Sequence, residues 1–107
     1  MDAKTFFTDK LPKQLEASPD KAKEIGAIYA FNVTGDGGGS WTANLKDALG
    51  VVEGAAADAE CTIDIANEDF EKVLDDPNAG MQLFFEGKLK VDGDPMLATK
   101  LQEIFKI

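Results

Sequence analysis

Five segments of the chain each offer one apolar face, and four of them do so by placing an apolar side chain at every second position. This alternation is typical of strands that bury one face and leave the other in water. The predicted strands are residues 27–33, 41–46, 51–53, 60–65 and 88–92. Most of their connections are short, among them the glycine-rich loop Thr34–Ser40, so the pattern favours a largely antiparallel sheet with one wet face.

The N-terminal stretch predicts a helix. Apolar side chains recur at four-residue spacing within residues 3–17, so they share one helical face. Pro12 lies inside this stretch and lacks the N–H that a helix interior needs, so we expect a break or kink near residues 9–11. A further short helical turn is expected between Pro19 and Ile25.

Two more helices are predicted between the fourth and fifth strands. Asn67 is expected to cap the first, which runs through Leu74 and carries acidic residues in its first turn, where the helix dipole favours them. The second spans residues 78–86 and ends at Gly87. It is apolar almost all round, which indicates burial or contact with lipid.

The chain closes with a strand, a turn and a helix. Gly93 ends the last strand, and Pro95 suits the first position of a helix because its missing N–H has no helical partner there. The apolar residues that follow at helical spacing are Leu97, Leu101, Ile104 and Phe105. Taken alone, such a face is interpreted as core packing, since any domain of this size needs a core.

These elements together predict an α/β (α+β) fold. One five-stranded, largely antiparallel sheet would be covered on one face by four to five helices. With 107 residues the chain is expected to form a single domain, residues 1–107, with one hydrophobic core.

The net charge of the chain argues against some classes of binding partner. Eleven basic and twenty acidic residues give a net charge of −9, which argues against nucleic acid, because Lys and Arg supply most of the affinity for phosphates. The same charge allows at most transient contact with an anionic membrane. The N-terminus does not resemble a secretory signal, and the C-terminus is not of the peroxisomal Ser-Lys-Leu type, so we expect a cytoplasmic monomer.

The residues needed for common catalytic and metal sites are scarce. The chain has no histidine and a single cysteine, Cys61, which falls on the apolar side of a strand and is interpreted as a core residue. The loop Gly35–Gly39 has Ser40 where a dinucleotide motif needs its third glycine, and a strand follows it instead of a helix. We therefore expect no catalysis, no cofactor and no metal.

The segment from Phe84 to Gln102, FFEGKLKVDGDPMLATKLQ, resembles the C-terminal signature of the sterol carrier protein-2 family. The similarity lies in the aromatic pair, the Gly-Lys-Leu-Lys run, the Gly-Asp step and the final Leu-Ala-x-Lys-Leu-Gln. Looser agreement is found at Phe6-Phe7, Ile28–Val33, Trp41 and Cys61–Ile63. Members of that family are small lipid-binding α/β domains with a hydrophobic tunnel between sheet and helices.

The resemblance implies a lipid-binding site in such a tunnel. Its expected lining residues are Phe31, Trp41, Met81, Phe84, Phe85, Leu97, Leu101, Ile104 and Phe105. The implied function is non-enzymatic binding or transfer of a lipid: fatty acid, fatty acyl-CoA, phospholipid or sterol. The alternative is a non-catalytic protein-interaction module with a filled tunnel, which exposed Phe84, Phe105 and Ile107 would favour.

Four positions depart from the family pattern. Ala79-Gly80 stands where relatives often have Asn-Pro, and Thr99 replaces an apolar residue. Glu86 replaces a glutamine, and a carboxylate at a tunnel mouth would repel an anionic head group. These differences leave the class of lipid open.

Overall fold

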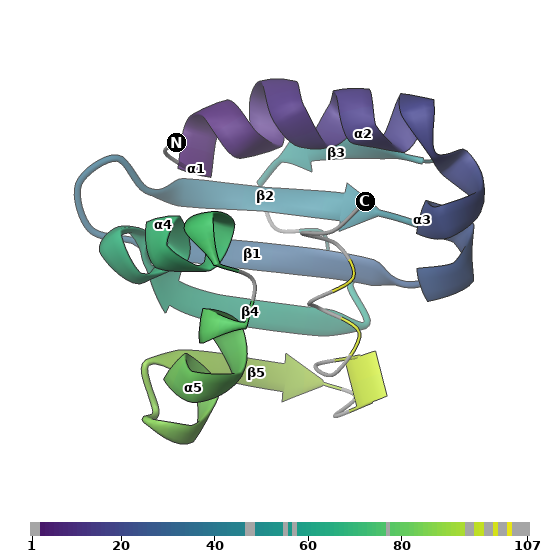
Figure 1. Cartoon of the computed structure of the whole chain (residues 1–107). Helices are drawn as coiled ribbons and strands as arrows, with labels where there is room; N and C mark the ends of the chain where they lie inside the picture. The colour runs from purple at the N-terminus through teal and green to yellow at the C-terminus, as the bar shows by residue number, and fades with distance from the viewer. Residues whose placement is uncertain are drawn as a thin grey trace.

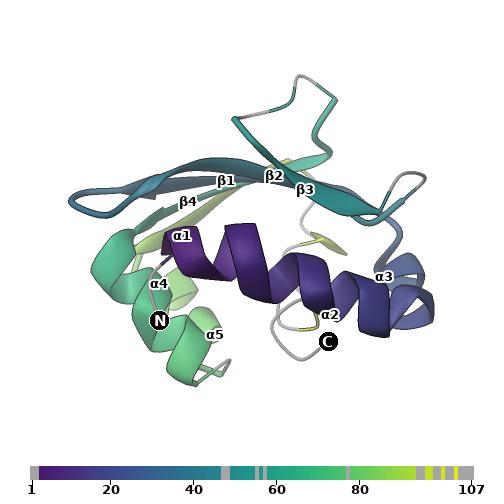
Figure 2. The ribbon, with the colours of Figure 1, turned by 90° about the horizontal axis from the view of Figure 1, so that it is seen from above.

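A computed structural model describes residues 3–46, 49–54, 56, 58–76, 78–93, 96–97, 100 and 103. Within these residues, a sheet carries the helices on one of its faces (Figures 1 and 2). The strands are β1 (Ile28–Thr34), β2 (Gly39–Asn44), β3 (Gly50–Glu53), β4 (Cys61–Ala66) and β5 (Leu89–Gly93). The helices are α1 (Ala3–Thr5), the π-helix η1 (Phe6–Lys10), α2 (Leu11–Ala17), α3 (Pro19–Ile25), α4 (Asn67–Asp75) and α5 (Ala79–Phe85).

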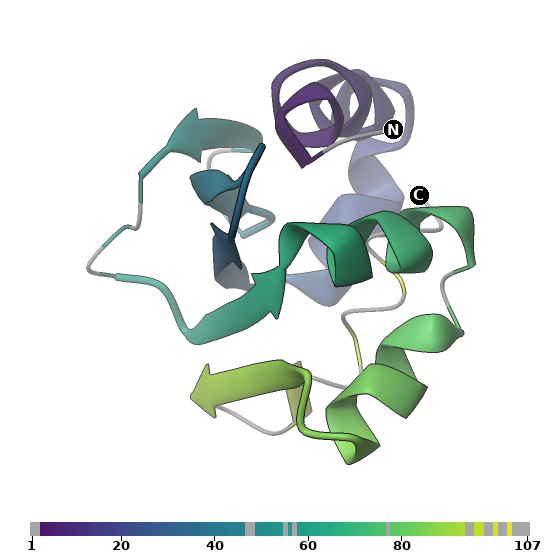
Figure 3. The ribbon, with the colours of Figure 1, turned by 90° about the vertical axis from the view of Figure 1, so that its left-hand side faces the viewer.

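The five strands form one sheet in the order β3-β2-β1-β4-β5. β1 and β4 run parallel, whereas the pairs β1–β2, β2–β3 and β4–β5 are antiparallel. The prediction of a five-stranded, largely antiparallel sheet covered by helices on one face is therefore confirmed. Viewed from the side in Figure 3, the helices and the described C-terminal residues lie on the same side of the sheet.

The other face of the sheet is less wet than the alternation predicted. After β3 the chain crosses over this face to reach β4 (Figure 2). Two backbone groups of this crossover form hydrogen bonds with the Thr42 side chain. The Thr42 hydroxyl donates to the Gly54 carbonyl at 2.7 Å and accepts from the Ala56 N–H at 2.9 Å. Thr42 and its neighbour Ala30 are buried on the face that was predicted to be in contact with water.

The N-terminal helix does not break before Pro12. Instead, α1, η1 and α2 continue into one another with helical backbone angles at Lys10 and Leu11. The Leu11 N–H donates to the Phe6 carbonyl, five residues back, which is the wider hydrogen-bond register of a π-helix. The prediction of a break was wrong, because the wider turn accommodates the missing donor of Pro12 without ending the helix.

Asn67 does not cap α4 as predicted. Ala66 is the N-cap residue, with an extended backbone, and Asn67 already belongs to the first helical turn. The Asn67 side-chain amide donates to the Asp36 carbonyl at 3.0 Å. Asn67 thus fixes the loop between β1 and β2 to the start of α4 rather than satisfying the helix N–H groups.

Candidate functional site

The face of the sheet that meets the helices is a continuous apolar layer. Alternate residues of β1, β2, β4 and β5 point into it, so the predicted inward faces of these strands are confirmed. The sheet residues of this layer are Tyr29, Phe31, Val33, Trp41, Ala43, Cys61, Ile63, Ile65 and Leu89. All of them are buried, Cys61 included.

Aromatic side chains fill the part of this layer beneath η1 and α4. Phe7 stacks on Trp41, with ring centroids 4.9 Å apart and planes at 17°, and on Phe70 at 5.3 Å and 24°. Phe31 lies 4.9 Å from Phe7 and 6.5 Å from Phe70. Phe31 and Trp41, two predicted lining residues, are thus packed against protein side chains of the N-terminal helix and α4.

Leu97 contacts the apolar layer at Tyr29 of β1. Leu97 is 9% exposed and belongs to the core, whereas Met96 before it is 69% exposed. The hydroxyl of Tyr29 donates to the Leu97 carbonyl at 2.6 Å in a buried position. Sequence reasoning included Leu97 but missed Tyr29. The available signal was a phenol hydroxyl on an otherwise apolar strand face, since a buried hydroxyl needs a partner.

The three predicted lining residues of α5 lie on its outer side. Met81, Phe84 and Phe85 are 37%, 44% and 78% exposed, and the two phenyl rings contact each other edge-to-face at 6.0 Å. Gly80 and Leu83 are the residues that α5 buries. In this structure α5 therefore presents Leu83 to the core and an aromatic pair to the surroundings.

The remaining predicted lining residues, Leu101, Ile104 and Phe105, lie outside the described residues. Lys100 and Glu103, which flank them, have helical backbone conformation, as do Met96 and Leu97. The described part of this C-terminal stretch lies on the same side of the sheet as α4 (Figures 1 and 2).

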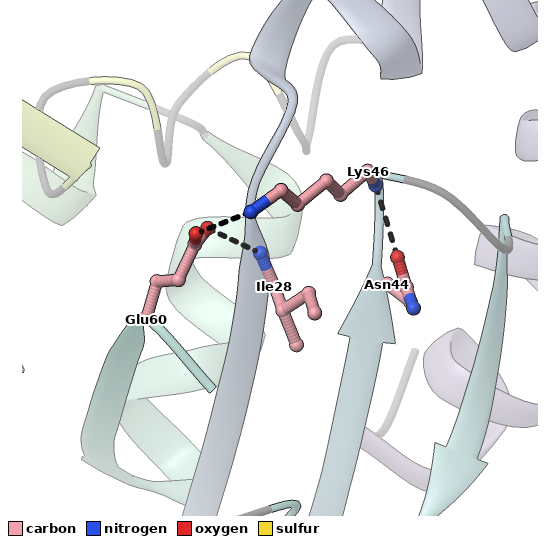
Figure 4. A network of polar contacts seen from close by, with 4 residues as sticks. All are labelled: Ile28, Asn44, Lys46 and Glu60. Atoms are coloured by element: carbon pink, nitrogen blue, oxygen red, sulfur yellow. Dashed lines mark hydrogen bonds and ion pairs between the residues drawn. The ribbon is translucent and has the colours of Figure 1, made fainter. Parts of the chain in front are cut away.

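Figure 4 shows a polar cluster near the start of β1, the end of β2 and the start of β4. Glu60 accepts a hydrogen bond from the Lys46 ammonium at 3.0 Å and from the Ile28 N–H at 3.2 Å. The Lys46 N–H in turn donates to the Asn44 side chain at 3.0 Å. The hydrogen bond from Lys46, followed by that from Ile28, lowers the pKa of Glu60. This cluster joins β1, β2 and the start of β4.

The described residues lack two features that would define other kinds of site. Among the described residues, no three or more Cys, His, Asp or Glu side chains are gathered where they could hold a metal ion. Within the same residues, no helix has both the length and the apolar character needed to cross a membrane.

The architecture defines a small mixed-sheet α/β domain with one apolar layer, and comparison with known proteins places it further. Residues 8–106 match the SCP-2 sterol transfer family. Sterol carrier protein 2 from Homo sapiens is 35% identical over 100 residues, which cover 89% of this chain and 18% of the human protein. The chain therefore belongs to the SCP-2 sterol transfer family, and it spans less than a fifth of the length of this relative.

Solved structures agree with this assignment. Sterol carrier protein 2 from Yarrowia lipolytica, in its apo form, has a TM-score of 0.75 and 28% identity, covering 95% of this chain and 82% of that chain. Sterol carrier protein-2 from Aedes aegypti, in complex with the C16 fatty acid palmitate, has a TM-score of 0.65 and 20% identity, covering 91% and 92%. The latter similarity shows a shared fold.

Proposed function

We propose that this chain binds a single apolar lipid chain against the helix-side face of its sheet and transfers it without chemical change. The observation that best supports this proposal is the continuous apolar layer of the sheet, against which Leu97 packs, in a chain that matches the family from residue 8 to residue 106. The wall opposite the sheet is proposed to include Leu97, Leu101, Ile104 and Phe105.

A fatty acyl chain is the ligand we favour. The complex of the similar Aedes aegypti protein with palmitate supports this choice. Burial of a C16 chain at about 0.8 kcal/mol per CH₂ contributes on the order of 10 kcal/mol before entropy and desolvation losses, enough for micromolar affinity. Glu86 does not stand alone as an anion, because its carboxylate lies 3.7 Å from the Lys88 ammonium. This pairing weakens the repulsion that Glu86 would exert on a carboxylate ligand.

The proposal extends to enzymatic activity, oligomeric state, cellular location and membrane contact. We propose a non-enzymatic role as a cytoplasmic monomer that touches membranes only transiently. The net charge of −9 supports the weak membrane contact, since anionic lipid surfaces attract basic proteins.

A second candidate function rests on α5. The exposed aromatic pair Phe84 and Phe85 favours a protein-interaction module, because exposed aromatic side chains are enriched at protein interfaces. In that case α5 would bind a partner protein and the space against the sheet would be filled by side chains of the chain itself.

Titration with a fluorescent fatty-acyl probe distinguishes the two functions. A lipid carrier should bind the probe saturably with micromolar or tighter affinity. Leu101→Glu should abolish binding, because it places a charge in the proposed wall, whereas Lys90→Ala, on the exposed edge strand β5, should bind like the native protein. Absence of saturable binding to the native protein would reject the carrier and leave the interaction module. Unchanged binding by Leu101→Glu would show that the wall is elsewhere.

A further inference from the structure

The outward face of α5 exposes apolar side chains at helical spacing. Met81, Phe84 and Phe85 stand at positions i, i+3 and i+4, which lie close together on a helix surface. The residues that α5 buries are Gly80 and Leu83, so the packing of α5 on the domain does not depend on this outward face. Single exposed apolar side chains are ordinary on a protein surface, whereas several that adjoin one another indicate a contact surface.

The two phenyl rings of this face are already arranged against each other. Their centroids lie 6.0 Å apart in edge-to-face geometry, and Phe85 is 78% exposed. In Figures 1 and 3, α5 lies beside α4 and β5 at a corner of the molecule, far from the N-terminal helix. A large, flat partner therefore has access to this corner.

The charges around α5 balance, although the chain as a whole is acidic. Residues 77–107 contain four acidic and four basic residues, so the whole excess of nine negative charges falls in residues 1–76. The sequence of α5 itself contains no charged residue. In the turn that follows, Glu86 lies 3.7 Å from the ammonium of Lys88. An electrically neutral surface thus fits this corner better than a charged one.

The small size of α5 argues against a stable protein interface. Its seven residues span about 10 Å at 1.5 Å per residue, so one face offers far less than the ~800 Å² that each partner buries in a stable complex. A bilayer has no such requirement, because its interfacial region takes up the apolar side chains of a helix that lies in its plane. An anionic bilayer would repel the acidic remainder of the chain, including Asp75 and Asp76 just before α5, whereas a zwitterionic bilayer would not.

We propose that the outward face of α5, formed by Met81, Phe84 and Phe85, is the surface through which this chain touches a zwitterionic lipid bilayer. The inference rests on the proposed function in one respect, since a lipid carrier has to reach a membrane to collect and deliver its ligand. The contact is weak and reversible, because α5 contributes no basic side chain that would attract lipid phosphates.

Partition into phosphatidylcholine vesicles, compared between Phe85→Gln and Val52→Thr, tests this surface. Val52 is 61% exposed on β3, at the opposite edge of the sheet from β5. Each substitution replaces one exposed apolar side chain with a polar one that suits its helix or strand. Phe85→Gln should bind the vesicles about tenfold more weakly than the native protein, because burial of one phenyl ring changes a partition constant by about that factor. Val52→Thr should bind like the native protein, and equal binding by all three would overturn the inference.

A tryptophan placed on α5 reports the contact directly. On phosphatidylcholine vesicles the emission of Phe85→Trp should shift to shorter wavelength and be quenched by brominated lipid, whereas that of Val52→Trp should not. Trp41 is buried in the core and contributes the same background to both proteins. Phosphatidylserine in the vesicles should weaken binding of the native protein at low salt. Stronger binding to the anionic vesicles would contradict the argument from charge.

Three outcomes separate this inference from the proposed function and from other partners of α5. Native protein that binds the fatty-acyl probe in solution but not the vesicles would overturn the inference and leave the carrier function standing. Native protein that binds the vesicles but not the probe would reject the carrier function and still support the α5 surface. A dimer in sedimentation velocity that Phe85→Gln abolishes would mean that α5 covers a second copy of the chain, and the proposed bilayer contact would be wrong.

Discussion

Hydrogen bonds to the side chain of Glu60 connect the ends of neighbouring strands. At the end of the sheet shown in Figure 4, one carboxylate of Glu60 accepts both the Lys46 ammonium and the Ile28 N–H, so that three strands are joined by one side chain. Both Lys46 and Glu60 are partly exposed, at 53% and 37% of their side-chain surface, and solvent screens their attraction. The contribution of this pair to stability should therefore be modest and should depend on pH and salt.

Glu60→Gln should remove a pH-dependent part of the stability. Because the hydrogen bonds lower the pKa of Glu60 in the folded state below the ordinary 4.5, its contribution is full above that value and is lost as the pH falls through the lower folded pKa. Urea unfolding at a series of pH values should show the native protein more stable than Glu60→Gln near neutral pH, with the difference vanishing in acid and shrinking in high salt. A constant difference at all pH values would contradict this assignment.

At the residue scale, the sequence predicts which side chains point inward but not what their polar atoms bind. The alternation of β1 places Tyr29 and Phe31 on the buried face, as found. It says nothing of a carbonyl 68 residues away, which only the tertiary fold brings to the Tyr29 hydroxyl. The same limit explains Asn67, whose residue type suits a helix cap but whose amide binds the carbonyl of Asp36.

At the scale of elements, the N-terminal helix and the β1–β2 hairpin are joined by stacked rings. Trp41 lies on the same face of β2 as Gly39, two residues earlier, and its indole covers the place where a Gly39 side chain would be. A Cβ at Gly39 would lie 2.8 Å from the Trp41 ring, which is itself stacked on Phe7. The absence of a side chain at Gly39 is thus part of how the helix packs on the hairpin.

Gly39→Ala should disturb this stack. We expect a loss of about 1–3 kcal/mol in the free energy of unfolding, as for other overpacked sites, together with a change in the emission of Trp41, the only tryptophan of the chain. Gly80→Ala is the matched control: the nearest atoms to its new Cβ are those of Val73 at 3.8 Å, and alanine favours helix α5 by about 0.5–1 kcal/mol. Native emission and stability in Gly39→Ala would refute the proposed packing.

Elements with a local pattern were predictable, and those set by distant pairing were not. All five strands and both helices between β4 and β5 follow from apolar spacing and from the glycines and prolines around them. The parallel pairing of β1 with β4, and the crossover that buries Thr42, depend on contacts between distant segments. The π-helical turn before Pro12 arises because the apolar side chains of Phe6 and Phe7 continue to pack on the core despite the missing N–H.

At the scale of the whole molecule, the described part of the proposed site is the apolar face of the sheet together with Leu97. The sheet side could be predicted, because alternation separates its two faces. The helix side was harder: α5 is apolar almost all round, so its pattern could not tell that Leu83 is buried while Phe85 is exposed. The orientation of such a helix is decided by the rest of the fold, here by its packing on α4 and β5.

Energetics favour an occupied site. A lipid pocket of about 500 Å³ is typical in size. A cavity in a protein core lowers the free energy of unfolding by about 24 cal/mol per Å³. An empty, rigid pocket of this size would therefore lower it by up to about 12 kcal/mol. That upper limit is comparable with the ~5–15 kcal/mol that holds an entire domain together. The protein should therefore retain lipid through purification, or else close the space with its own side chains.

Native mass spectrometry of the purified chain tests the central claim most directly. The account predicts a complex heavier than the bare polypeptide by the mass of one fatty acid or similar lipid, which is released on denaturation and is replaced when palmitate is added. A spectrum containing only the bare polypeptide, unchanged after palmitate is added, would contradict the claim that this domain carries lipid.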